Sequence, residues 1–353
     1  MRGAASSRGR VTYRFAFKPY RRELAVPLRT AHGVWAMREG LVVRLEGEDK
    51  TAGYGEIAPV TWFGTETLEE ATALCAAWAG KLDEETLDAV PERFGCVRFA
   101  IDIARAEVER GLRTRSEPAR NPGSSPQRLP VAALLPSGRA SLEQLPGRLE
   151  QGFLCLKWKV GVGDAIDEMG ILEDLLGALP AYVKLRLDAN GAWDRRTAEK
   201  WLARCAERPV EFVEQPVVPE ARDVLLGLAR DYPVKLALDE AVVRLEAARR
   251  WQAEGWNGIF VLKPALCGPL SEIAAWVQKT KADIVLSSAI ETAVGKAAIL
   301  RWALTSGLTT RALGFGTGEM FAHRGWDGPA MGSLLDGAWC DAVKPEELWN
   351  ELI

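Results

Sequence analysis

The stretch that decides the fold is FLCLKWKVG, residues 153–161, in which an apolar run ends in two lysines. Its four leading apolar residues are typical of a strand that is buried on both faces. Lys157 and Lys159 flank Trp158, and because side chains alternate along a strand, both lysines point to the same face. A core strand that ends with two charges on one face indicates that this end of the strand does more than fill a core.

Seven further apolar runs have the same form, and helical patterns such as DEMGILEDLLGAL separate most of them. The eight runs are PVAALL at 130–135, FLCLKWK at 153–159, YVKLRLD at 182–188, VEFVEQP at 210–216, VKLALDE at 234–240, GIFVLKP at 258–264, ADIVLSS at 282–288 and TTRALGF at 309–315. Strands and helices that alternate in this way, with near-continuous apolar strands, predict a parallel sheet.

Polar residues follow one another at the spacing of successive βα units near the ends of six of these runs. They are Lys159, Asp188, Glu214, Asp239, Lys263 and Ser287. Eight units predict an α/β fold with a TIM barrel, here of the (β/α)7β type. A doubly wound sheet is the alternative, but the glycine-rich phosphate loop that usually follows its first strand is absent. The carboxyl ends of barrel strands share one mouth, so we expect the six residues to converge there.

The first hundred residues differ from this series and predict a separate α+β unit. Strands are expected at 11–20 and 41–59, and helices at 67–82, where Thr67 and Glu70 form a capping box, and at 94–112, ending near Gly111. The segment RTRSEPARNPGSSPQR at 113–128 is rich in Pro, Ser, Gly and Arg and lacks periodicity, which is typical of a linker.

The composition excludes several classes of protein. With 353 residues, 48% hydrophobic and 26% charged, the chain is long enough for one large or two smaller cores. A net charge of −3 argues against nucleic acid as the main partner, since phosphate binding favours a basic surface. No apolar run is long enough to span a bilayer, and MRGAASSRGR lacks the apolar segment of a secretory signal.

Histidine and cysteine usage narrows the chemistry. Only His32 and His323 occur, which weakens a Ser-His-Asp, Cys-His or histidine-rich metal site. Six cysteines stand apart in sequence without a CxxC pair, so neither a zinc knuckle nor a redox dithiol is expected. Buried thiols in a reducing compartment are the simplest interpretation, and we expect a cytoplasmic protein.

Asp188, Glu214 and Asp239 end three consecutive predicted strands. Carboxylates held together repel one another unless a cation lies between them. Oxygen ligands without His or Cys suit one hard divalent ion, Mg²⁺ or Mn²⁺. The alternative is three helix N-caps, but three such residues in successive units, with a lysine-bearing strand on each side, favour the metal.

Lys159 and Lys263 lie on the second and sixth predicted strands, across the barrel from each other. They could simply be exposed lysines at strand ends. The shared face of Lys157 and Lys159 should instead be the barrel interior, where desolvation or another cation lowers the pKa of a lysine enough for it to act as a base.

Several motifs of the chain resemble those of a known family. The motifs KWK at 157–159, LRLDAN at 185–190, VEFVEQP at 210–216, LALDE at 236–240 and VLKP at 261–264 resemble the muconate-lactonizing subgroup of the enolase superfamily. GYGEIAP at 53–59 extends the resemblance over almost the whole chain. The mandelate-racemase subgroup is less similar, because it would place a His base near the seventh strand and this sequence has none there. In such sites a metal and ammonium groups stabilise the enediolate formed when a proton is removed next to a carboxylate.

Within the subgroup, LSSAIETAVG at 286–295 and LGFGTGEMF at 313–321 most resemble dehydratases of menaquinone and phylloquinone biosynthesis. These convert 2-succinyl-6-hydroxy-2,4-cyclohexadiene-1-carboxylate to 2-succinylbenzoate. The resemblance implies a small-molecule carboxylate as partner, with no nucleic acid and no membrane, and leaves monomer or homo-oligomer open. An N-succinylamino acid racemase or a dipeptide epimerase is the alternative, although LGFGTG offers no acidic residue for a dipeptide ammonium before Glu319.

The resemblance also implies a role for each site residue. Lys159 would remove the α-proton and return it to the leaving hydroxyl, while Lys263 would stabilise the anion. Asp188, Glu214 and Asp239 would hold the metal. The residues expected to contact substrate are Lys157, Asn190, Arg186, Ser287, Ser288 and Gly314.

Three parts of the chain follow from the same resemblance. Residues 1–125 would form a capping domain, residues 126–315 the barrel, and residues 316–353 a segment that packs back on the cap. PLRTAHGVWAMREG at 27–40 would be a flexible loop that covers the substrate, with Arg29, His32 and Gly33 in it. Some relatives carry a larger residue at the position of Gly191, so the resemblance does not fix the size of the pocket there.

Overall fold

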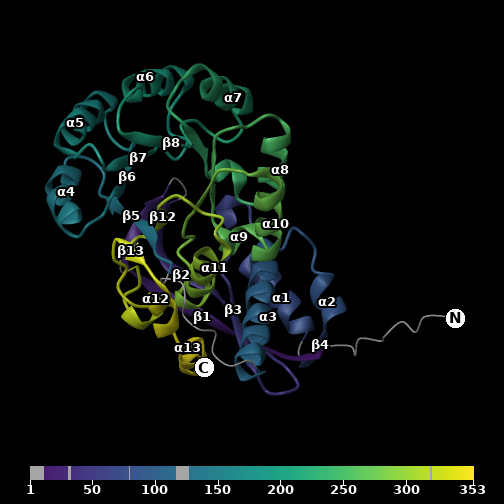
Figure 1. Ribbon diagram of the computed structural model, residues 1–353. Coiled ribbons are helices and arrows are strands. Elements are labelled where there is room, and N and C mark those ends of the chain that lie inside the picture. Colours follow the sequence, from purple (N-terminus) through teal and green to yellow (C-terminus); the bar gives the residue numbers. More distant parts are fainter. Residues whose placement is uncertain (1–11, 31–32, 79, 117–126, 319) are drawn as a thin grey trace.

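The structure is a computed structural model that describes residues 12–30, 33–78, 80–116, 127–318 and 320–353 (Figure 1). An antiparallel sheet with its helices lies against one side of a parallel barrel, and the carboxyl-terminal segment returns to the antiparallel sheet. The α/β barrel with an α+β cap predicted from the sequence is confirmed.

Each of the eight apolar runs forms a barrel strand. The strands are β5 (Leu129–Leu135), β6 (Cys155–Lys159), β7 (Lys184–Asp188), β8 (Val210–Glu214), β9 (Leu236–Leu238), β10 (Ile259–Leu262), β11 (Ile284–Leu286) and β12 (Leu313–Gly316). They pair in parallel in chain order, and β12 pairs with β5. A bridge between Ser287 and Gly314 links β11 to β12 and completes the circle.

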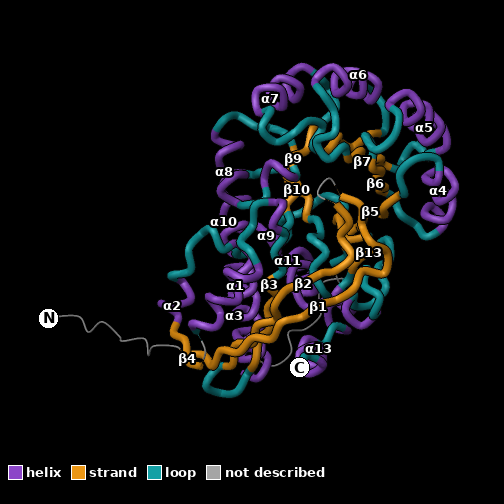
Figure 2. The backbone as a smooth tube through the Cα atoms, turned by 180° about the vertical axis from the view of Figure 1, so that it is seen from behind, coloured by secondary structure: helices purple, strands orange, loops and turns teal. Residues whose placement is uncertain are grey.

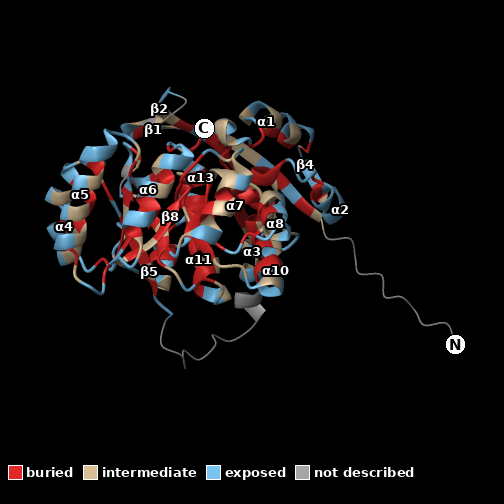
Figure 3. Ribbon diagram, turned by 90° about the horizontal axis from the view of Figure 1, so that it is seen from above, coloured by how far each residue is buried: buried red, intermediate tan, exposed pale blue. Residues whose placement is uncertain are grey.

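Helices cover the outside of the barrel (Figure 2). They are α4 (Ala140–Glu150), α5 (Ala165–Ala178), α6 (Arg195–Cys205), α7 (Arg222–Asp231), α8 (Leu245–Ala253), α10 (Leu270–Thr280) and α11 (Ala293–Ser306), with short turns η2 (Glu240–Val242) and α9 (Pro264–Cys267). In the described residues after β12 no further helix covers the barrel in this way, which makes the barrel (β/α)7β. Figure 3 shows α11 buried along most of its length, because barrel, cap and carboxyl-terminal segment all pack on it.

Alternation along the strands separates two cores. Inward-pointing Phe212, Ala237, Ile259, Val261 and Val285 fill the barrel interior. Outward-pointing residues pack under the helices: the Trp158 ring centroid lies 6.5 Å from that of Trp201, and Phe260 meets Trp276 edge-on at 5.2 Å. The same alternation carries inward-pointing polar residues to the strand ends.

The cap is a four-stranded antiparallel sheet in the order β3 (Ala52–Ile57), β2 (Gly33–Glu46), β1 (Thr12–Thr30) and β4 (Gly80–Asp83). Helices α1 (Leu68–Ala77), α2 (Glu84–Asp88) and α3 (Gly95–Ser116), with turn η1 (Thr61–Phe63), complete it. Gly53 and Gly55 let α3 lie directly on β3, since a Cβ at either would be 2.0 Å from the carbonyl oxygen of Ala104 or Ala100.

The carboxyl-terminal segment contains η3 (Arg324–Trp326), β13 (Leu334–Leu335), α12 (Gly337–Ala342) and α13 (Pro345–Glu351). β13 pairs antiparallel with β5, and Lys18 of β1 donates from Nζ to the carbonyl of Leu352 at 2.6 Å. The segment therefore touches both barrel and cap. None of the helices in the described ranges combines the length and apolarity needed to cross a bilayer.

Three expectations about the cap were wrong and one was right. The segment 27–40 is not a loop: its described residues form the paired end of the β1–β2 hairpin, with Leu28 opposite Trp35. Residues 80–83 form β4 because they pair with Thr12–Phe15, instead of extending the helix. α3 continues past Gly111 to Ser116, into the expected linker, whose residues 117–126 lie outside the described ranges. The capping box of Thr67 and Glu70 is confirmed.

We predict that Gly55→Ala destabilises the protein by about 1–3 kcal/mol, because the added Cβ would force α3 away from β3. Urea unfolding followed by circular dichroism measures the change. Gly170→Ala is the matched control: this exposed glycine of α5 has open space at its Cβ, and alanine should stabilise by roughly 0.5–1 kcal/mol. Equal stability of Gly55→Ala and the unchanged protein would contradict the prediction.

Candidate active site

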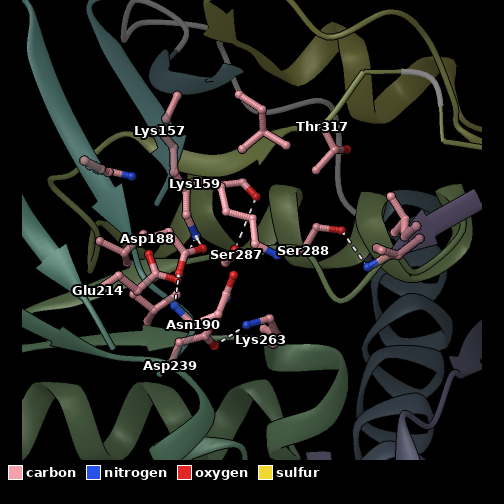
Figure 4. A pocket seen from close by; sticks show the side chains of 18 of the residues that line it. Lys157, Lys159, Asp188, Asn190, Glu214, Asp239, Lys263, Ser287, Ser288 and Thr317 are labelled. Carbon is pink, nitrogen blue, oxygen red and sulfur yellow. Dashed lines mark hydrogen bonds and ion pairs between the residues drawn. The ribbon is translucent and has the colours of Figure 1, made fainter. Parts of the chain in front are cut away.

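A cavity of about 580 Å³ opens at the carboxyl ends of the barrel strands. All eleven predicted site residues line it: Lys157, Lys159, Arg186, Asp188, Asn190, Glu214, Asp239, Lys263, Ser287, Ser288 and Gly314. Figure 4 shows the residues of this set that it labels, all but Arg186 and Gly314, converging from several strands and the turns that follow them. The structure thus brings the predicted set together.

The three carboxylates lie side by side and deeply buried. Exposed fractions are 8% for Asp188, 1% for Glu214 and 5% for Asp239. Burial, and then repulsion from Asp188, raises the pKa of Glu214 well above its usual value, although Lys157 opposes the shift. Carboxylates so placed need positive charge next to them.

Lysines supply that charge (Figure 4). Lys157 Nζ lies 2.8 Å from Asp188 Oδ2 and 2.7 Å from Glu214 Oε1, and Lys263 Nζ contacts Asp239 Oδ1. Burial would lower the pKa of Lys157, but attraction to Asp188 and Glu214 outweighs it and raises that pKa. With the lysines in these positions, no group of three His, Cys, Asp or Glu side chains among the described residues surrounds a common metal position.

Lys159 and Lys263 approach the cavity from opposite sides. Lys159 ends β6 and Lys263 follows β10, four strands away in the circle of eight. Lys159 is exposed to the cavity and forms no hydrogen bond or ion pair with any residue that the structure describes. The Lys263 ammonium lies 5.2 Å from the ring centre of Phe63 in the cap. Lys159 is therefore the lysine that is free to meet a substrate.

Two residues that the sequence reasoning missed support the carboxylates. Gln215 is fully buried, and its Oε1 accepts from the backbone N–H of Asp239 at 3.1 Å and of Ala241 at 3.2 Å. Glu240 accepts from Asn190 Nδ2 at 3.1 Å, and burial, then Asp239, raises its pKa to about 7. Both residues lie within the motifs VEFVEQP and LALDE, directly after Glu214 and Asp239. That position next to a predicted metal ligand is the sequence signal that could have identified them.

Arg186 forms the floor of the cavity. Only 1% exposed, it donates from Nε to Glu211 Oε2 at 2.6 Å and from Nη1 to the Ala312 carbonyl at 2.9 Å. Glu211 in turn pairs with Arg311, whose guanidinium also binds Asp283. Two of the three guanidinium nitrogens of Arg186 are thus engaged below the cavity, and Nη2, buried, has no partner among the described residues.

The turn after β11 differs from expectation at Ser288. Its hydroxyl donates to Glu291 at 3.1 Å and accepts from the N–H of Ile290 at 2.9 Å, so its hydrogen is not directed at a substrate. Ser287 Oγ is held only weakly, 3.4 Å from the Gly314 carbonyl. A Cβ at Gly314 would lie 2.8 Å from Ser287 Oγ, which explains the glycine.

Apolar walls complete the cavity. Lining residues that were not predicted as part of the site include Val26, Phe63, Leu134, Leu135, Ile290 and Met320, together with the polar Ser137 and Thr317. Val26 and Leu28 come from the β1–β2 hairpin of the cap, and Leu28 lies in the segment 27–40 that the family resemblance placed over the substrate. The side chain of Arg29, and the residues His32 and Glu319, lie outside the described part of the chain.

A capped (β/α)7β barrel with carboxylates and opposed lysines at its mouth defines an enzyme of the enolase type. Residues 140–324 match the family described as enolase C-terminal domain-like, and residues 15–108 match the MenC N-terminal domain. The o-succinylbenzoate synthase of Thermosynechococcus vestitus is 40% identical over 86% of this chain and 92% of its own length, and that of Pectobacterium atrosepticum is 33% identical over 75% and 78%. The chain belongs to the o-succinylbenzoate synthase family of the enolase superfamily.

Solved structures agree with this assignment. The crystal structure of o-succinylbenzoate synthase from Thermosynechococcus elongatus, complexed with Mg in its active site, has a TM-score of 0.82 and 37% identity. The match covers 96% of this chain and all of that one. A dipeptide epimerase from Methylococcus capsulatus, with a TM-score of 0.76 and 22% identity over 93% of this chain and 97% of its own, shows the shared fold.

The ion cluster below the cavity should make stability depend on pH. Burial would raise the pKa of Glu211 and of Asp283, but Arg186 and Arg311 outweigh it at Glu211, and Arg311 and Lys235 at Asp283, so both pKa values are lowered. The stabilisation is therefore complete above the unfolded pKa values of about 4 and fades as the pH falls through the lower folded values.

We predict that Arg311→Met costs about 2 kcal/mol of unfolding free energy at pH 7 and much less near pH 3. The cost stays below that of a fully buried pair because the Asp283 side chain is 31% exposed. Urea unfolding at several pH values measures it. Arg204→Met, which breaks an exposed pair with Glu173, is the control and should change stability by under about 0.5 kcal/mol at either pH. A pH-independent cost for Arg311→Met would refute the cluster's role.

Proposed function

We propose that this protein is an o-succinylbenzoate synthase, which dehydrates 2-succinyl-6-hydroxy-2,4-cyclohexadiene-1-carboxylate to 2-succinylbenzoate on the route to menaquinone or phylloquinone. One observation carries the proposal: in a chain that matches a member of this family over 86% of its length, two opposed lysines and three buried carboxylates face one cavity. The six cysteines are free and buried, which supports a reducing compartment and the cytoplasm as the place of action.

The residues present fit one divalent ion of the hard type. Asp188, Glu214 and Asp239 offer only oxygen donors from neighbouring strands, the ligand type that Mg²⁺ prefers. The three carboxylates outnumber the two ammonium groups of Lys157 and Lys263 that contact them, so the site can accept further positive charge. When bound, the ion would neutralise the substrate carboxylate and stabilise negative charge that develops on it. We propose Mg²⁺ as the bound ion, with Mn²⁺ as the alternative.

Lys159 is proposed to carry the proton. As a neutral amine it removes the hydrogen from C1 of the substrate ring, and the electron pair moves into the carboxylate to form an enediolate. The pair then returns to form the C1–C6 double bond, the C6–O bond breaks, and the Lys159 ammonium gives its proton to the departing hydroxyl. Water and the aromatic product result, and Lys159 is neutral again.

Lys263 and Lys157 are proposed to act through charge. Lys263 enters from the opposite side, where its ammonium is attracted to the enediolate without taking a proton. Lys157 and Asn190 stand beside the carboxylates, so they are placed to orient the reacting carboxylate of the substrate. The apolar side chains of Val26, Leu28 and Ile290 give the ring a surface that excludes water.

A racemase needs the same pair of opposed lysines, because each face of the substrate requires its own base. Incubation of N-succinylamino acids with the protein in deuterated water would detect that activity. Deuterium from solvent would then enter the α-position of N-succinylamino acids, and both lysines would be needed for it.

We predict that Lys159→Ala lowers turnover at least about a thousandfold, since the only group that moves the proton is gone. The assay follows loss of diene absorbance with Mg²⁺ present, and calorimetry tests whether 2-succinylbenzoate still binds. Lys184→Ala is the control: exposed Lys184 lies at the start of β7, the end away from the cavity, so turnover by this variant should be unchanged. Retention of more than about a tenth of the activity by Lys159→Ala would rule out its role.

We predict that removing divalent ions with a chelator abolishes turnover and that Mg²⁺ restores it. Glu214→Gln should weaken Mg²⁺ binding at least about tenfold in calorimetry, because it removes one of three anionic ligands. Glu220→Gln, an exposed carboxylate just beyond the same strand, should bind Mg²⁺ normally. Full activity in chelator would contradict the metal proposal.

A further inference from the structure

A buried carboxylate of the cap reaches across to the barrel. Glu56, on β3, is fully buried and accepts four hydrogen bonds. One comes from Tyr20 Oη at 2.6 Å within the cap. The other three come from the barrel: Thr292 N–H at 2.9 Å, Thr292 Oγ1 at 2.6 Å and Gly295 N–H at 2.9 Å. The cap thus supplies an anion to the start of α11.

The barrel is built to admit this carboxylate. Thr292 is the N-cap of α11, and its hydroxyl also accepts from Val294 N–H at 3.3 Å. A Cβ at Gly295 would lie 2.9 Å from Glu56 Oε2, so only glycine leaves room there. Negative charge at a helix N-terminus is favourable, and here it comes from more than 200 residues away in sequence.

A second cap residue holds the turn between β11 and α11, residues 287–292. Arg38, 1% exposed, donates from Nε to the Ile290 carbonyl at 2.9 Å and from Nη1 to that of Pro59 at 2.8 Å. Ile290 has φ of +60°, a conformation that β-branched residues rarely adopt. The Arg38 contact and the Glu56 contacts hold both sides of this strained position.

The held turn forms one wall of the cavity. Ser287 and Ile290 line it, and the N–H of Ser288 donates to the Gly314 carbonyl at 3.1 Å, which ties the turn to β12. The proposed proton-transfer and metal residues come from β6 to β10 and the residues that follow these strands. A shift of the turn would therefore change the shape of one wall without moving those groups.

We propose that Glu56 and Arg38 are positioning residues that set the part of the cavity receiving the succinyl arm, with its distal carboxylate near Ser287. The inference rests on the proposed function, because that function supplies the arm. The cap selects substrates through the backbone of the turn, in addition to covering the cavity.

Glu56→Gln tests the proposal with little change in size. The amide keeps one acceptor oxygen but turns N–H donors toward the N–H groups of α11, so at least one contact is lost. We expect KM for the cyclohexadiene substrate to rise about tenfold while kcat stays within about twofold. Tyr20→Phe is the matched control: it removes a hydrogen bond from the same carboxylate on the cap side only, and KM should change less than about threefold.

Ligand binding separates positioning from general damage. Calorimetry compares 2-succinylbenzoate with 2-butyrylbenzoate, in which a methyl group replaces the distal carboxyl group. In Glu56→Gln we expect the Kd of 2-succinylbenzoate to rise about tenfold and that of 2-butyrylbenzoate to change less than about threefold. Equal weakening of both ligands, or weakening of neither, would overturn the proposal.

Two further comparisons keep the test decisive. If Glu56→Gln does not fold, Thr292→Val removes the hydroxyl contact from the barrel side, and Thr292→Ser restores it; the same loss and recovery of discrimination between the ligands is expected. Absence of turnover in the unchanged protein would defeat the proposed function. Normal turnover with unchanged discrimination in the variants would defeat this inference alone.

Discussion

Burial of like charges at one end of the barrel is the constraint on which the rest of this structure depends. Asp188, Glu214 and Asp239 are nearly inaccessible, and such groups are stable only beside positive charge. Lys157 on β6 and Lys263 after β10 provide this positive charge at the same end of the barrel, while Arg186 closes the barrel interior below them. The barrel interior is thus divided between a polar mouth, a salt-bridged floor and an apolar cluster, and the alternation of side chains places each of them.

The barrel could be predicted because each of its strands shows the same local sequence pattern. Each strand is a short apolar run that ends in a polar residue, and period-two alternation decides which residues face inward. This sufficed to bring Lys159, Asp188 and Lys263 to one cavity from positions far apart in sequence. It also sent Trp158 to the helix layer, where it packs near Trp201.

The features that could not be predicted depend on contacts with other residues, which a local sequence pattern does not show. Residues 27–40 contain two glycines and several polar residues, as loops do, yet the described residues of this segment belong to the paired strands β1 and β2. Ser288 looked like a donor to substrate, but Glu291, three residues on, takes its hydrogen. The anchoring of α11 by Glu56 joins a strand of the cap to a helix of the barrel, and a single sequence shows only that GYGEIAP and ETAVG both exist.

The bond from Lys18 to the carbonyl of Leu352 has a consequence for how the molecule assembles. β1 leaves the ribosome before any barrel strand, and α13 leaves after all of them, yet each needs the other to satisfy its polar groups. Contacts that span so much of the chain form late and slowly. During synthesis the barrel strands are therefore all available to pair before α13 can reach β1, and the bond between Lys18 and Leu352 can form only when the chain is almost complete.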